Sequence, residues 1–244
     1  ARGIVRAGRD HLRRHHTFLP RACVSLNTYV FRRITVPNTA VVIVCLPKAT
    51  PTDQLATAAI ARLATSNPLT NASPAGRFPV TTRLRRGSLV QPWHGTAAGG
   101  PVQLLDLDAM RASAHHAYWY RWHIWQQVAA GTRPAQPFWH FADRHRDEPA
   151  KYSLDNAQRH YLAQPRIAAM RTYNALPNKI MALPTSHLEA FQSGAYAYAN
   201  IGWLSAVPGD GMVTLDGQYL AATSGRLADQ VSYLDIAQGH LTAL

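Results

Sequence analysis

An apolar run at residues 39–46, Thr-Ala-Val-Val-Ile-Val-Cys-Leu, most constrains what this chain can fold into. The run is rich in β-branched residues and too short for a helix of its own, so it predicts a buried strand. A helix start follows at once, because Thr50 suits the cap, Pro51 the first position and Asp53 the positive end of the helix dipole. The helix is expected to end at Asn67-Pro68 and to bury a face that contains Leu55, Ala59 and Leu63.

The residues up to 144 extend this unit. Strand structure is predicted over 78–86 and 89–93, which together form one long bent strand, and over 102–108, and a long aromatic helix is predicted over 109–130. The stretch 137–144 is expected to be the strand that closes the sheet. The order strand, helix, long bent strand, strand, helix is most of a split βαβ, ferredoxin-like unit, although such a fold hosts many functions.

One part of this unit resembles a known family. Residues 84–86 (Leu-Arg-Arg) run into 89–93 (Leu-Val-Gln-Pro-Trp), and a glycine-containing turn leads to an apolar stretch over 102–109. This pattern resembles the bacterial-type small-subunit ribosomal protein six family, in a mitochondrial version with N- and C-terminal extensions. In that family a Leu-Arg-Arg-type segment runs into Leu-Ala-Tyr-Pro-Ile, and the strand after the turn ends in an acid and a small residue. The match covers roughly residues 35–145.

The resemblance implies a subunit on the platform side of the particle that binds ribosomal RNA together with a neighbouring protein, the eighteenth of the bacterial series. The chain departs from the family pattern at a Gly87-Ser88 insertion, at Gln91, which replaces an aromatic residue, and at Trp93, which replaces an isoleucine. The positions that carry over are Leu84, Arg85, Arg86, Leu89 and Pro92.

Charge favours a polyanionic partner. The chain of 244 residues has 25 basic and 13 acidic residues, a net charge of +12, and all but three of the basic residues are arginine. Arginine forks onto phosphate and stacks on bases, so an excess of this size indicates nucleic acid. The alternative is a compositional preference for arginine without a partner. The expected RNA-binding residues are Arg83, Arg85 and Arg86, with Arg6, Arg9, Arg13, Arg14, Arg32 and Arg33.

The N-terminus is arginine-rich and contains a single acid, Asp10, within residues 1–33. Such a segment resembles both the end of a mitochondrial transit peptide and the basic arms that thread into ribosomal RNA. The predicted localisation is therefore the mitochondrial matrix. No apolar run approaches the ~18–20 residues of a membrane span, so membrane insertion is not expected.

The aromatic helix is expected to have two different faces. Tyr118, Trp122, Trp125 and Ala129 recur at helical spacing and are predicted to pack on the sheet, and Gly131 ends the helix. Large or charged side chains elsewhere on the helix predict a protein-partner surface, since tryptophan and arginine are favoured interface anchors. The residues assigned to this surface are Trp119, Arg121 and His123.

Catalytic and metal-binding motifs are not found. The sequence contains no P-loop, GxGxxG, GxSxG or HExxH pattern, and its histidines lack the spacing of a metal centre. Asp106 and Asp108 would share a strand face, but the preferred interpretation is that Asp108 caps the following helix. Cys23 and Cys45 give neither a disulfide framework nor a metal site, and Cys45 is interpreted as a small buried hydrophobe. We therefore expect no enzyme, cofactor, metal or small-molecule substrate.

Together these features predict an α+β protein with a ferredoxin-like core and a mostly helical C-terminal extension. The predicted segments are a basic arm over 1–34, the core over 35–145 and the extension over 146–244. The predicted function is that of a structural constituent of the mitochondrial small ribosomal subunit, in contact with ribosomal RNA and neighbouring ribosomal proteins. Two alternatives stay open: an accessory subunit of a mitochondrial respiratory or ATP-synthase complex, and a mitochondrial RNA-processing factor.

Overall fold

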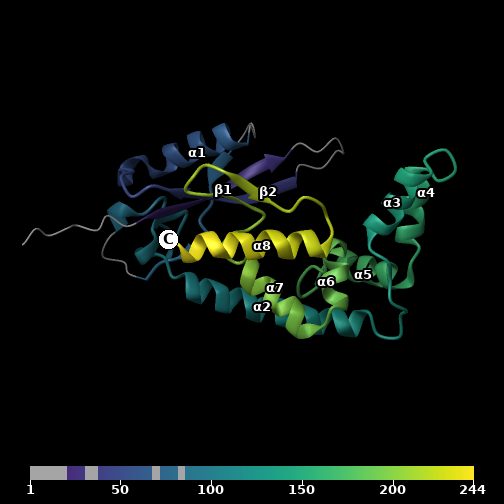
Figure 1. The fold of residues 1–244 in the computed structure, drawn as a ribbon. Helices are drawn as coiled ribbons and strands as arrows, with labels where there is room; N and C mark the ends of the chain where they lie inside the picture. The colour runs from purple at the N-terminus through teal and green to yellow at the C-terminus, as the bar shows by residue number, and fades with distance from the viewer. Residues whose placement is uncertain (1–20, 31–37, 68–71, 82–85) are drawn as a thin grey trace, which may run out of the picture.

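A mixed β-sheet lies at the centre of the computed structural model, which describes residues 21–30, 38–67, 72–81 and 86–244 (Figure 1). The described strands of this sheet pair in the order β3-β1-β2-β7-β8, and β6 pairs with β1 as well. Their bounds are β1 (Ala22–Val30), β2 (Asn38–Leu46), β3 (Ala72–Pro74), β6 (Gly99–Pro101), β7 (Gly211–Val213) and β8 (Tyr219–Ala221). A separate short pair joins β4 (Phe78–Pro79) to β5 (Thr96–Ala97).

Helices occupy most of the remaining chain. The described α-helices are α1 (Leu55–Ser66), α2 (Leu107–Val128), α3 (Phe138–Asp147), α4 (Leu154–Leu162), α5 (Pro165–Ala175), α6 (Leu188–Gln192), α7 (Ala195–Ser205) and α8 (Leu227–Thr242). Short 3₁₀ turns are η1 (Thr52–Gln54), η2 (Arg86–Ser88), η3 (Val102–Leu104) and η4 (Thr185–His187). The α+β class and the helical C-terminal half are therefore as the sequence predicts.

The two long strands are buried on both faces. β1 and β2 are antiparallel, with a register that runs from Ala22 opposite Leu46 to Val30 opposite Asn38. On one face Val42, Val44 and Leu46 pack against the buried side of α1. This face is that expected from the sequence, because α1 buries Leu55, Ala59 and Leu63.

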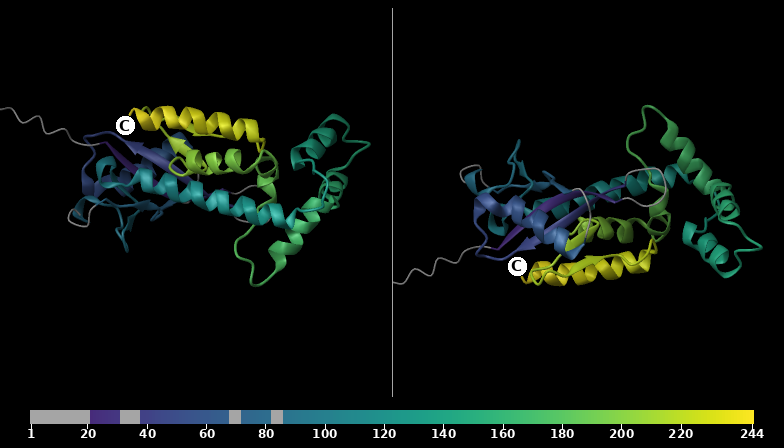
Figure 2. Two further views of the ribbon diagram at one scale, coloured as in Figure 1. Left: turned by 90° about the horizontal axis from the view of Figure 1, so that it is seen from below. Right: turned by 90° about the horizontal axis from the view of Figure 1, so that it is seen from above.

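The opposite face of the sheet packs on the C-terminal helices. Ile43 and Cys45 of β2 belong to a core that also contains residues of α2, α7 and α8. In Figure 1, α1 lies on one side of the sheet and α8, α7 and α2 lie on the other. Figure 2 shows α3 and α4 at the end of the molecule that is farthest from the sheet. The sheet is therefore the middle of three layers.

The neighbours of β2 differ from those expected. β1 comes from the segment assigned to the basic arm, and the parallel neighbour β7 comes from the segment assigned to the extension. In the predicted ferredoxin-like arrangement, both neighbours of β2 would instead be strands from within residues 78–144. The described sheet thus combines strands from all three predicted segments.

Three predicted strands are wrong. Residues 137–144 form most of α3 instead, because Phe138 and Phe141 both contact Tyr161 of α4, a helical spacing of three. Residues 102–108 form η3 and the start of α2. Residues 89–93 make only isolated bridges, since Gln91 has a positive φ of 46° that breaks an extended strand.

The strand predicted over 78–86 is confirmed only at Phe78–Pro79, and residues 82–85 lie outside the described part. The expected caps also differ. Thr50 makes no side-chain cap, and Pro51 precedes η1 rather than beginning it. Asp106, and not Asp108, caps α2 by accepting a hydrogen bond from the Ala109 backbone N–H at 2.9 Å. The prediction that Asp108 caps the helix is therefore wrong, and the two carboxylates do not share a strand face.

Candidate functional site

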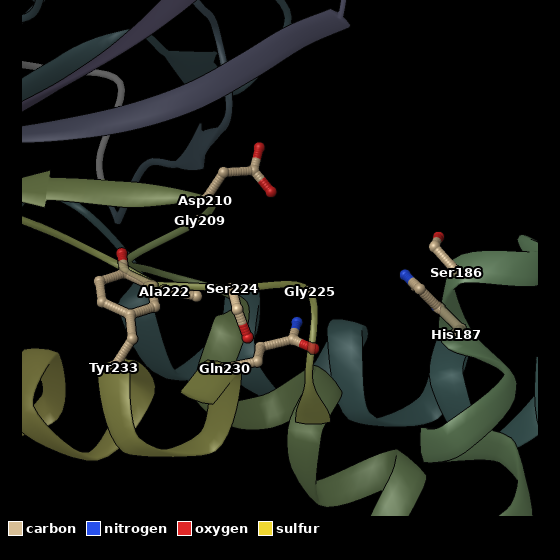
Figure 3. Close-up of a pocket in the computed structure, with 9 residues that line it drawn as sticks. All are labelled: Ser186, His187, Gly209, Asp210, Ala222, Ser224, Gly225, Gln230 and Tyr233. Atoms are coloured by element: carbon tan, nitrogen blue, oxygen red, sulfur yellow. The ribbon is translucent and has the colours of Figure 1, made fainter. Parts of the chain in front are cut away.

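Two adjoining cavities of about 220 Å³ and about 210 Å³ lie where the loop before β7 meets η4, α2, α7 and α8. Both are lined by His187, Gly209, Asp210 and Gln230, and together they are called the His187 pocket. Figure 3 shows the first cavity, in which Ser186 and His187 lie across from Asp210 and Gln230. The second cavity adds Val41, Arg77, Ala114, Tyr118, Gly202, Ser205 and Ala206.

A backbone turn places the carboxylate of the pocket. Gly209 has a φ of 65°, and a Cβ atom there would lie 2.8 Å from the carbonyl oxygen of Val41. Only glycine fits this turn without strain. The next residue, Asp210, donates its N–H to the Val41 oxygen and accepts the Val41 N–H on Oδ2 at 2.8 Å. The sheet thereby fixes Asp210 at the point where β7 joins β2.

His187 is held among aromatic rings. Its Nδ1 lies 2.9 Å from the hydroxyl of Tyr198, and its ring stacks on Tyr118 at 6.0 Å. The pKa of His187 is lowered to about 4, mainly by burial and also by the positive charge of Arg121, while Asp210 opposes the shift. The imidazole is therefore neutral at pH 7.

Arg77 brings a buried positive charge to the same pocket. Its Nη2 donates to the carbonyl oxygen of Ala206 at 3.0 Å, whereas its buried Nη1 has no hydrogen-bond partner among the described residues. Burial lowers the pKa of the guanidinium, and the carboxylate of Asp210 opposes that change. Arginine keeps its charge in proteins, so the pocket combines a cation, a carboxylate and a neutral imidazole.

This chemistry favours binding over acid–base catalysis. A general base works best when its pKa lies near the working pH, and that of His187 is well below it. Burial raises the pKa of the Tyr198 hydroxyl, so this group stays protonated and donates rather than abstracts a proton. What the arrangement can do is hydrogen-bond a small polar group between Arg77 and His187.

The RNA-binding residues predicted from the sequence lie mostly outside the described part of the chain. The predicted residues that lie outside the described ranges are Arg6, Arg9, Arg13, Arg14, Arg32, Arg33, Arg83 and Arg85. Arg86 begins η2, and only its backbone is described. Their role in RNA binding therefore stays a prediction.

The predicted partner surface is divided. Trp119 is 44% exposed, and its ring centroid lies 4.0 Å from that of His123. Arg121 turns instead toward the His187 pocket, where its guanidinium lies 5.1 Å from the Tyr118 ring centroid. The inward face is as expected, since Trp125 and Ala129 are buried and Tyr118 and Trp122 pack against the same core.

Sequence reasoning missed the pocket as a whole. His187 lies within residues 185–189, whose sequence is typical of a capping box, but no side-chain cap forms there. Glu189 instead accepts hydrogen bonds from the Trp139 indole N–H at 3.0 Å and the Leu227 backbone N–H at 3.1 Å. The only local signal is the Pro-Gly-Asp-Gly turn at 208–211, which marks a turn and not a site.

Comparison with known protein families, with curated proteins and with solved structures finds no match to this chain. Within the described residues, no three histidine, cysteine or acidic side chains gather as metal ligands would. No helix in the same residues is both long and apolar enough to cross a membrane.

Proposed function

We propose that this chain is a structural, non-catalytic subunit of the mitochondrial small ribosomal subunit, where it binds ribosomal RNA and neighbouring proteins. The observation that carries the proposal is the placement of its basic surplus along the sequence. Residues 1–20, 31–37, 68–71 and 82–85 contain nine arginines and one acid. The described residues contain 16 basic and 12 acidic side chains, which is close to balance. Two thirds of the net charge thus belongs to residues 1–20, 31–37 and 82–85, which in the sequence precede β1, link β1 to β2 and follow β4.

Several arginines of the folded body are already used within it. Arg62 donates to the carbonyl oxygens of Thr214 and Leu215, and Arg166 donates to Thr132 and Gln192. Others have comparable contacts: Arg111 lies over Trp203, Arg144 over Tyr152, and Arg226 over Trp139. A guanidinium engaged in this way has fewer donors left for phosphate. We therefore assign phosphate binding to the arginine-rich segments, together with Arg86, which completes the Leu-Arg-Arg positions of the family resemblance.

The mechanism would be phosphate neutralisation, which positions RNA without reading its sequence. The ribosomal and mitochondrial parts of the proposal rest on the resemblance of residues 84–93 and on the basic N-terminus. Neither part depends on a ferredoxin-like arrangement. In the described sheet the two neighbours of β2 are β1 and β7, and both come from outside residues 35–145.

The test compares two triple variants that remove the same charge. One changes Arg83, Arg85 and Arg86 to alanine, and the matched control changes Arg133, Arg159 and Arg171, which are exposed on the folded body. We expect the first to weaken binding to small-subunit ribosomal RNA and to flatten the salt dependence, by about 0.9 in log–log slope per lost phosphate contact. The control should change both quantities much less. Equal effects of the two triples, or unchanged binding by the first, would contradict the assignment.

A second candidate is an accessory subunit of a respiratory or ATP-synthase complex, held by proteins alone. The exposed ring of Trp119 favours it, because tryptophan is enriched at interface centres. The expected result for this alternative is association that survives both high salt and ribonuclease. A Trp119→Ala variant would then release the chain, whereas it would leave an RNA-held chain in place.

A further inference from the structure

The two cysteines of the chain lie directly opposite each other near one end of the β1–β2 ladder. Cys23 of β1 pairs with Cys45 of β2 in the antiparallel register, and their Sγ atoms are 3.9 Å apart. Both are free thiols, and each residue is 1% exposed. The sequence gives no reason to pair them, because the two residues are 22 positions apart and belong to different predicted segments.

The backbone geometry already suits a covalent link. Directly opposed residues of antiparallel strands have Cα atoms about 4.5–5.5 Å apart, and disulfides span Cα separations of about 4.4–6.8 Å. Closure then needs a change in the two side-chain torsions and little movement of the strands. A displacement of one residue along either strand would place the two sulfurs on opposite faces of the sheet.

We propose that Cys23 and Cys45 form a thiol–disulfide site that closes into a cross-strand disulfide when the chain meets a disulfide oxidant such as oxidised glutathione. The thiolate of Cys45 attacks one sulfur of the oxidant, which forms a mixed disulfide and releases one glutathione thiolate. Cys23 then loses its proton to solvent and attacks the Cys45 sulfur, which releases the second glutathione. The cysteine pair loses two electrons, and one glutathione disulfide becomes two thiols.

The order of the two steps follows from the charges around the sulfurs. Either S–H can donate across the 3.9 Å contact; with Cys45 as the thiolate, the Cys23 S–H donates to it, which raises the pKa of Cys23 and lowers the pKa of Cys45. Arg62 adds a positive charge that lowers the pKa of Cys45 further, against the effect of burial. Since the thiolate is the nucleophile in disulfide exchange, Cys45 is the attacking residue and Cys23 the resolving one.

Burial in the core controls access to the pair. Both thiols belong to the buried cluster that also contains Phe78 and residues of α7 and α8. Beside Cys23, β6 pairs closely with β1, because a Cβ atom on Gly99 would be 2.3 Å from the Cys23 carbonyl oxygen. An oxidant of the size of glutathione reaches the sulfurs only when this region opens, so the oxidation rate should reach a plateau as its concentration rises.

The experiment uses the full chain, folded and reduced, in buffers of stepped oxidised-to-reduced glutathione ratio. Remaining thiols are alkylated after unfolding, and intact mass is measured by mass spectrometry. We expect a product that has lost two hydrogen atoms, resists alkylation and is restored by reductant. The closed loop should raise the Tm by on the order of 5 °C.

The matched control is the double variant Val44→Cys/Cys45→Ala, which keeps two thiols on the same strands but on opposite faces. It should collect glutathione adducts without forming the internal link. The single variant Cys23→Ala should stop at the mixed disulfide on Cys45. The proposal would be overturned if the native chain is alkylated at both thiols in the most oxidising buffer, or collects only glutathione adducts.

Discussion

Burial is the largest influence on the protonation of His187. The ring is enclosed by Tyr118 and Tyr198 and has a pKa of about 4, with burial as the largest cause. The folded state therefore binds this proton less well than the unfolded state. The resulting stabilisation is complete above the ordinary histidine pKa of 6.5 and is lost as the pH falls from there toward 4.

The His187→Gln variant tests this directly. We expect the native chain to lose roughly 2–3 kcal/mol of unfolding free energy from this residue between pH 7 and pH 4.5. The variant should lack that part of the slope when denaturant unfolding is measured across the same range. Tyr198→Phe is the informative control, because it removes the hydrogen bond but retains most of the burial and so should keep the slope. An unchanged slope in His187→Gln would show that another group controls the acid dependence.

The start of α2 distinguishes two neighbouring carboxylates. Asp106 accepts the Ala109 N–H, whereas the side chain of Asp108 is 94% exposed and contacts Arg111 at 3.2 Å. Asp106→Ala should therefore lower the free energy of unfolding by about 1 kcal/mol, the usual effect of losing an N-cap. Asp108→Ala should change it by less, since exposed ion pairs contribute little. Chemical denaturation of both variants measures the two free energies of unfolding. A larger loss in Asp108→Ala than in Asp106→Ala would contradict the assignment of Asp106 as the N-cap.

At the scale of elements, α2 and α7 are in close contact. A Cβ atom on Gly202 would lie 2.5 Å from Cγ of Tyr118, so the two helices meet without room for a methyl group. This contact also sets the position of Tyr118 against His187. The His187 pocket therefore depends on the α2–α7 packing.

Gly202→Ala is expected to destabilise the protein by roughly 1–3 kcal/mol, because the added methyl group must push the helices apart. Gly239 in α8 is the matched control, since a Cβ atom there meets nothing within 4 Å. Gly239→Ala should stabilise by roughly 0.5–1 kcal/mol through helix propensity alone. Thermal unfolding of the two variants should thus show shifts of opposite sign, and a stabilising Gly202→Ala would contradict the packing.

Elements with one clear period were predictable from the sequence. β2, α1 and the inward face of α2 are found where the apolar pattern places them. β1 was missed because residues 22–26 are buried on both faces and show no alternation, and an arginine-rich segment precedes them. The sequence of α3 favours a strand prediction because Trp139 and His140 separate its two phenylalanines, and this separation hides the helical period. The His187 pocket has no signature because it assembles Arg77, His187 and Asp210 from distant segments.

At the scale of the whole molecule, the net charge is distributed unevenly along the sequence. Residues 1–20, 31–37 and 82–85 contain nine arginines and one acid, whereas the described residues are close to balance. Long-range attraction of a polyanion depends on such a surplus and weakens as salt increases. This uneven distribution of charge supports the proposed role in a ribonucleoprotein.

The most direct measurement is sedimentation of a gently lysed mitochondrial extract, in which gradient fractions are probed for this chain with and without ribonuclease. The proposed function predicts comigration with small-subunit ribosomal RNA, and loss of that comigration after ribonuclease treatment. Comigration with a membrane complex that resists ribonuclease would contradict it, and would direct attention to Trp119 as the anchor.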